Sequence, residues 1–304
     1  MVDGTSKSEV MTDAERKEVA GGLKQWAPGF LKNWIRQRRK QRHLAERHRQ
    51  LADCIRQDDL FVVGHPKSGN TWLTYMLAIL VRDDRGRDIN LANIGQYAPT
   101  IHARDHVIRE FGDMPSPRIF RNEGPRFAEL YPRTVFIVRD PRSVLLSYYH
   151  HCVHDTGESD WPIESFVDEM LEHGCIPRLE PFQTRWDAKL EEWIGRAERQ
   201  PVKIVRYEDL KADRGAVLRD LAAFAGLSPS TELIEEAVRR GDFNSMRSEE
   251  KTVGAESYGG EKGARGFFVR KGKTDSWKVE MSADVIEKIE AAFRPGMKKL
   301  SYLD

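Results

Sequence analysis

The chain has 304 residues and a formal net charge of +1, with 32% charged and 39% hydrophobic residues. This balance is ordinary for a soluble protein with a substantial core, and the near-neutral charge argues against a dedicated nucleic-acid binder. The longest near-continuous apolar run, residues 72–81, is far too short to span a bilayer. The three cysteines have no CxxC spacing, and no charged segment followed by an apolar one opens the chain. We therefore expect a cytoplasmic protein without a signal peptide or a disulfide framework.

Basic residues dominate the segment 31–51, where apolar residues recur at helical spacing. We expect a solvated helix there that packs Trp34 and Ile35 on the rest of the protein. The alternative is a surface for an acidic partner, anionic lipid or a polyanionic substrate. We treat residues 1–54 as an N-terminal extension and residues 55–304 as a single α/β domain.

Residues 61–72 read as a strand, a tight loop and the start of a helix. A loop of this kind points backbone N–H groups at one spot, at the positive end of a helix dipole, and binds an anion. Gly64 and Gly69 have the spacing of a phosphate-binding loop, but Asn70 occupies the place where nucleoside triphosphatases carry lysine. The lysine comes earlier, at Lys67. The pattern indicates a phosphate-shaped loop that is not built for ATP and magnesium.

Further strand candidates alternate with helical patterns along the chain, at residues 117–123, 134–138 and 202–205. This alternation predicts a P-loop-like central parallel sheet with helices on both faces, which binds ligands at the carboxyl ends of its strands. Polar side chains stand at those ends: Lys67, Glu123, Arg139, and Tyr207 with Glu208. A second basic group, at 270–272, follows a glycine-rich stretch, so a ligand with phosphates at two places is expected.

The chain has no convincing pair of acidic magnesium ligands, which an enzyme that moves a dianionic phosphoryl group normally needs. A sulfuryl group carries one charge fewer, so Lys67 and the loop amides alone could stabilise it. This observation favours sulfuryl over phosphoryl transfer.

Four motifs, in order, resemble those of the cytosolic-type sulfotransferases, which move a sulfuryl group from 3′-phosphoadenosine 5′-phosphosulfate (PAPS). Residues 66–72 resemble the family's PKSGTTW, and residues 138–150 resemble its RNPKDVxVSYYH. Residues 206–210 are similar to RYEDL, and residues 270–278 to RKGxxGDWK. The resemblance covers residues 60–280 and implies a transfer to a hydroxyl or amine of a small-molecule or carbohydrate acceptor.

The resemblance implies a role for each matched residue, and it implies no metal. Lys67 would bridge to the leaving phosphate oxygen. The 5′-phosphate would be held by Ser68, Gly69, Asn70 and Thr71. The adenine would contact Trp72, Tyr207 and, opposite Trp72, Phe243. The 3′-phosphate, which distinguishes PAPS from ATP, would be held by Arg139, Ser147, Arg270, Lys271 and Gly272.

The sequence departs from the family at the general base. The family commonly has a strand like PRIIKTH that ends in a histidine base, whereas residues 117–123 end in Glu123. A carboxylate can act as the base if burial lifts its pKa toward the working pH. We therefore expect Glu123 to be the base, with Arg121 assisting near the sulfuryl group in place of the family's lysine.

Two alternatives to this assignment stay open at the level of sequence. Glu123 could be a structural carboxylate paired with Arg121 or Arg126. The base could instead be His102 or His106.

Two further features bear on assembly and metal binding. The family's dimer segment KxxxTVxxxE is degraded, because Lys278 and Glu287 keep their spacing but Ser282-Ala283 replace Thr-Val. We therefore do not expect that particular dimer. The histidines at 150, 151 and 154 look like metal ligands, but the family match accounts for His150 without a metal.

Two rival functions remain: a P-loop kinase of a small molecule, which Asn70 disfavours, and a catalytically silent nucleotide-binding module that displays the basic helix. The acceptor pocket should be lined by residues 83–106, 160–173 and 248–266, which carry the least family signal. The acceptor is therefore left open.

Overall fold

The computed structural model describes residues 29–81, 89–101, 105–156, 161–174, 176, 184–253 and 274–304. The described residues divide into two separate compact units, with the boundary between Asp53 and Cys54. The first contains helix α2 (Gly29–Ala52), which lies where the basic helix was expected. Its residues from 36 to 43 are exposed, and the guanidinium of Arg38 lies 4.5 Å from the centre of the Trp34 ring.

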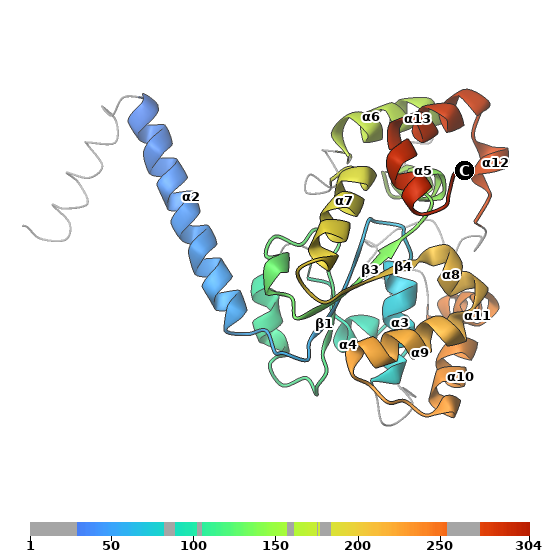
Figure 1. Ribbon diagram of the computed structural model, residues 1–304, viewed down its shortest axis with the longest axis horizontal. Coiled ribbons are helices and arrows are strands. Elements are labelled where there is room, and N and C mark those ends of the chain that lie inside the picture. Colours follow the sequence, from blue (N-terminus) through green and yellow to red (C-terminus); the bar gives the residue numbers. More distant parts are fainter. Residues whose placement is uncertain are drawn as a thin grey trace, which may run out of the picture. The chain divides into compact units, whose positions relative to one another are not determined.

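The second unit is built on a four-stranded parallel sheet with the strand order β2-β1-β3-β4 (Figure 1). The strands are β1 (Leu60–Gly64), β2 (Ile119–Arg121), β3 (Arg133–Val138) and β4 (Val202–Arg206). The register pairs Val62 with Arg121 on one side of β1, and Gly64 with Ile137 on the other. The parallel α/β fold predicted from the sequence is confirmed.

The α-helices of this unit are α3 (Asn70–Leu80), α4 (Ile94–Tyr97), α5 (Pro141–Thr156), α6 (Ile163–His173), α7 (Trp186–Ala197), α8 (Tyr207–Ala212), α9 (Arg214–Ala225), α10 (Thr231–Arg240), α11 (Phe243–Val253), α12 (Trp277–Glu280) and α13 (Ala283–Lys299). Of two 3₁₀ segments, Asp105–Phe111 lies between α4 and β2, and Ala128–Leu130 lies between β2 and β3. Within the described parts of the chain, none of the helices is both long and apolar enough to cross a membrane.

Alternate side chains of each strand enter two different cores, as the pleat of a strand requires. Val62 and Ile137 point into a core shared with α3, α9 and α10. On the other face Phe61 stacks on Tyr131, and Phe136 lies with its ring centre 5.7 Å from that of Trp193 on α7. Because both faces are buried by helices, the carboxyl ends of the strands are left as the place for a ligand.

A buried ion pair joins the start of β1 to the start of β2. Arg118 and Asp59 are 1% and 0% exposed, and the guanidinium donates to both carboxylate oxygens at 2.8 and 2.5 Å. The same guanidinium donates to the carbonyl oxygens of Cys54 and Phe111, and Leu60 N donates to Arg118 O at 2.9 Å. This set of bonds fixes the register of β2 against β1, and so the position of the residues that follow β2.

Replacing Asp59 by Asn should lower the free energy of unfolding by about 3–5 kcal/mol, because it leaves the Arg118 charge buried without its counter-ion. Urea denaturation measures the change. The matched control is Asp220→Asn, which breaks a half-exposed pair with Lys203 and should lose less than about 1 kcal/mol. Equal losses in the two variants would contradict a structural role for the buried pair.

Candidate active site

The loop between β1 and α3 turns through two residues of left-handed backbone. Lys67 has a φ of 68° and Gly69 a φ of 100°. Ser68 N donates to His65 O at 3.1 Å and closes the turn. Backbone of this kind forms concavities that bind anions, and here it leads into the N-terminus of α3. A left-handed conformation is uncommon for a residue with a side chain and is a form of strain that clusters at functional sites.

The two glycines of this loop let other side chains approach closely. A Cβ on Gly69 would lie 2.7 Å from the Tyr207 ring, and one on Gly64 would lie 2.7 Å from the carbonyl oxygen of Ile137 and would also clash with Asn70. The loop therefore fits between β3, α8 and its own Asn70 only because neither position carries a side chain.

Ser68 has a hydroxyl that is suited to a ligand. The residue is completely buried, and its Oγ has no hydrogen-bond partner among the described residues. Such a group is destabilising unless it is satisfied, so it marks a place where a ligand oxygen can bind.

The end of β2 brings Glu123 and Arg121 to the same loop. Asn70 Nδ2 donates to Glu123 Oε1 at 3.1 Å and to the carbonyl oxygen of His65 at 3.0 Å. Arg121 donates to the hydroxyl of Thr71. Glu123 is partly buried. The structure thus brings together the predicted base, the predicted assisting cation and the predicted phosphate-binding residues.

Sequence reasoning missed a lysine in this group. Lys189 on α7 is 4% exposed, and its Nζ donates to the backbone oxygen of Glu123 and lies 3.5 Å from that of Gly64. It stands on the apolar face formed by Trp186, Leu190 and Trp193, all of which are buried. A charged residue within that face is the signal that could have identified it.

His65, in the loop itself, is buried and uncharged near neutral pH. Burial and the charge of Lys189 lower its pKa to about 4, while hydrogen bonding at Pro66 and the charge of Glu123 act in the opposite direction. Lys189, His65 and Glu123 therefore interact electrostatically at the carboxyl ends of β1 and β2.

The residue after β3, Arg139, joins the loop from the other side. Its Nη1 donates to Lys67 O at 3.3 Å, and its guanidinium lies 4.2 Å from the centre of the Tyr207 ring. Tyr207 also lies 5.2 Å from Trp72, between ring centres, and burial raises the pKa of its hydroxyl. Trp72 Nε1 donates to the carbonyl oxygen of Gly241 at 2.7 Å.

The remaining predicted ligand residues fall partly within and partly outside the described residues. Phe243 and Ser147 are half-buried, at the start of α11 and on α5. Arg270, Lys271 and Gly272 lie outside the described residues, as do His102 and the side chain of His106.

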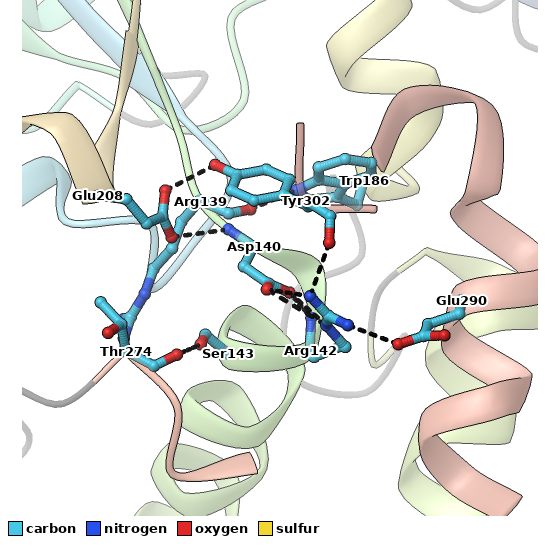
Figure 2. Close-up of polar contacts among 9 residues, drawn as sticks. All are labelled: Arg139, Asp140, Arg142, Ser143, Trp186, Glu208, Thr274, Glu290 and Tyr302. Atoms are coloured by element: carbon cyan, nitrogen blue, oxygen red, sulfur yellow. Dashed lines mark hydrogen bonds and ion pairs between the residues drawn. The ribbon is translucent and has the colours of Figure 1, made fainter. Parts of the chain in front are cut away.

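A polar network anchors the turn that carries Arg139 (Figure 2). Asp140 accepts from Arg142, whose guanidinium also donates to Glu290 on α13 and to the carbonyl oxygen of Tyr302. Glu208 accepts from Asp140 N at 3.2 Å and from the Tyr302 hydroxyl at 2.7 Å.

Two further hydrogen bonds extend this polar network, and one of them contacts Thr274, just after the predicted basic motif at residues 270–272. Trp186 Nε1 donates to Arg139 O at 3.0 Å, and the Ser143 hydroxyl donates to the carbonyl oxygen of Thr274 at 2.5 Å (Figure 2). Thr274 is two positions after Gly272. The first described residue after the 270–272 motif is therefore held against the N-terminal turn of α5, one turn before Ser147.

His150 pairs with a carboxylate, its Nε2 lying 2.8 Å from Glu280 Oε2, and the side chain of His154 lies outside the described residues. No group of three or more His, Cys, Asp or Glu side chains that could hold a metal ion occurs in the described parts of the chain.

Comparison with known proteins gives consistent results. The Sulfotransferase domain family matches residues 57–301. The amine sulfotransferase of Oryctolagus cuniculus is 23% identical over 256 residues, which is 80% of this chain and 82% of that protein. A structure of retinol dehydratase in a complex with retinol and PAP has a TM-score of 0.63 and 17% identity, over 80% of this chain and 82% of that one. Mouse sulfotransferase SULT7A1, complexed with PAP, has a TM-score of 0.62 and 19% identity, over 80% and 86%.

At these identities the solved structures establish the fold alone, and the family is established by the domain match. That match begins before β1, takes in the whole sheet with its strand-end loops, and ends after α13. The chain therefore belongs to the sulfotransferase family.

Proposed function

We propose that the protein transfers a sulfuryl group from PAPS to a hydroxyl or amine of a small-molecule or carbohydrate acceptor, with Glu123 as the general base. The observation that carries this proposal is the convergence of Glu123, Lys67 and Arg139 on one anion loop from three different strand ends. The presence of PAP, the spent form of this donor, in solved structures of the same fold supports the choice of donor.

The loop fits the 5′-phosphosulfate of the donor. The buried Ser68 hydroxyl would gain a partner, and the N-terminus of α3 would favour the negative charge. Gly69, Asn70 and Thr71 complete this set. The adenine would lie against Trp72 and Tyr207, with Phe243 opposite.

The 3′-phosphate would bind Arg139 and Ser147, together with Arg270, Lys271 and Gly272. The bond from Ser143 to Thr274 supports this set, because it brings the chain next to the basic motif to the helix that carries Ser147. The Asp140–Arg142 network would keep the Arg139 turn rigid, so that little ordering is needed when the donor binds.

The chemistry follows from the positions of these groups. Glu123 would accept the proton of the acceptor hydroxyl. The oxygen of that hydroxyl would attack sulfur in line with the bond between sulfur and the 5′-phosphate oxygen. The bond between sulfur and that oxygen breaks, and Lys67 would neutralise the charge that develops on the leaving oxygen. Arg121 would stabilise charge on the sulfuryl group. The products are the sulfated acceptor and adenosine 3′,5′-bisphosphate (PAP).

Isothermal calorimetry with PAP, followed by transfer of labelled sulfate from PAPS into a metabolite extract read by mass shift, tests this function. We expect PAP to bind and a sulfated product to form without added ATP. If PAP does not associate with the purified protein, the donor assignment is wrong. If it binds but a broad acceptor panel shows no transfer, the protein is a nucleotide-binding module.

Replacing Glu123 by Gln should lower the turnover number by about 10²–10⁴-fold, because the amide accepts no proton. The affinity for PAP should stay nearly unchanged, since Gln keeps an oxygen for Asn70. The control is Glu129→Gln, an exposed residue on a 3₁₀ segment, which should leave the turnover number as it is. Near-normal turnover in the Glu123 variant would remove this residue from the mechanism.

Replacing Arg139 by Ala should weaken PAP at least about tenfold more than it weakens adenosine 5′-phosphate, which lacks the 3′-phosphate. Calorimetry with the two ligands gives this ratio, which separates loss of a phosphate contact from distortion of the loop. Arg133→Ala serves as the control, because Arg133 stands at the opposite end of β3 and donates to Ala225 O. Equal losses for both nucleotides would reject the 3′-phosphate assignment.

A further inference from the structure

The proposed mechanism assigns no role to Lys189, although this lysine is buried in the candidate site. It comes from α7, which lies on the face of the sheet opposite α3 (Figure 1). Its Nζ reaches the carboxyl ends of β1 and β2. Its ammonium group bonds the backbone oxygen of Glu123 and lies 3.5 Å from that of Gly64, the last residue of β1. One side chain thus contacts both the start of the anion loop and the residue predicted to be the base.

A purely structural reason for this charge is weak. Burying an ammonium group is unfavourable by several kcal/mol, and well-packed apolar side chains of similar volume often serve stability equally well. Trp186, Leu190 and Trp193 on the same face are apolar and buried. Lys189 also lines a cavity of about 120 Å³ together with Gly124, Arg126 and Glu192, so a second cation and a carboxylate share this space with it.

The charge of Lys189 acts on the two titratable groups next to it. It helps to keep His65 neutral, and Glu123 acts on His65 in the opposite direction. The groups with a described relation to Glu123 include Lys189 from α7, and Asn70 and His65 from the loop. Two further charged side chains, Arg126 and Glu192, line a cavity together with Lys189. A positive charge that is bonded to the backbone of the same residue favours the ionised form of its carboxyl group, which is the form that a base requires.

We propose that Lys189 is a positioning residue of the sulfuryl-transfer site, which fixes the backbone of Glu123 against the anion loop and holds its carboxylate in the charged form. This inference rests on the proposed role of Glu123 as the base. Lys189 would not need to touch donor or acceptor; it acts through Glu123 and Gly64.

The test compares Lys189→Met, which removes the charge at similar volume, with Lys189→Arg, which keeps it. In the Met variant we expect the turnover number to fall about 100-fold, with the KM for PAPS little changed. The acid limb of the pH profile of kcat/KM should move up by about 1 pH unit, because the base is harder to ionise without the lysine charge. The Arg variant should restore the position of that limb.

The control is Lys203→Met, which removes a lysine of β4 that pairs with Asp220 at the surface. It should change neither the acid limb of the pH profile of kcat/KM nor the turnover number. A role limited to packing would lower the melting temperature and PAP binding in both Lys189 variants without moving the pH profile. That result, or normal turnover in the Met variant, would overturn the proposal.

A measurement without any acceptor separates this inference from the proposed function. Protein labelled with ¹³C at the Glu carboxyl carbons is titrated by NMR, and the Glu123 signal is assigned by its loss in Glu123→Gln. The midpoint for Glu123 should lie about 1 pH unit higher in Lys189→Met than in the unaltered protein. An unchanged midpoint refutes the electrostatic role of Lys189 whether or not the protein proves to bind PAP or to transfer sulfate.

Discussion

The parallel pairing of β1 with both of its neighbours is the constraint on which the site depends. Parallel strands end at the same edge of a sheet, so the loops that follow β1, β2 and β3 must meet there. The register of the strands then determines which side chains lie at this edge. Val62 pairs with Arg121, so Glu123 follows at the level of the loop. Gly64 pairs with Ile137, which comes two residues before Arg139. Groups separated by dozens of residues in sequence thereby surround one anion-binding turn.

Buried charges hold this arrangement at both ends of the strands. At the amino ends, the pair of Asp59 and Arg118 ties β1 to β2. At the carboxyl ends, Arg142 links the turn after β3 to α13, and Lys189 contacts the ends of β1 and β2. The free-energy cost of burying each charge is offset by hydrogen bonds. Because these bonds form only in a defined geometry, they favour one arrangement of the strand ends over others.

Membership of the sulfotransferase family defines the type of group that is transferred, and the surroundings of the loop are compatible with it. Lys67 lies in the turn and Arg139 donates to its backbone oxygen, so two cations belong to this place, and Asn70 bonds the Glu123 carboxylate there. One relative is named for an amine, and the structure of a neighbour with a similar fold contains retinol, so the small molecules associated with these proteins differ chemically.

The sequence by itself determined the parallel α/β fold, the anion loop and the strand ends, because periodicity, the Gly64–Gly69 spacing and polar residues after apolar runs are local signals. It also placed Glu123 at the end of a strand. Only the tertiary structure decided that Asn70 would bond this carboxylate and that Lys189 would reach it from α7. A charge within the apolar face of α7 marks Lys189 as unusual, but neither bonding partner can be read locally. Asn70 and Lys189 are 53 and 66 residues from Glu123, and which face of the sheet α7 covers depends on the packing of the whole chain.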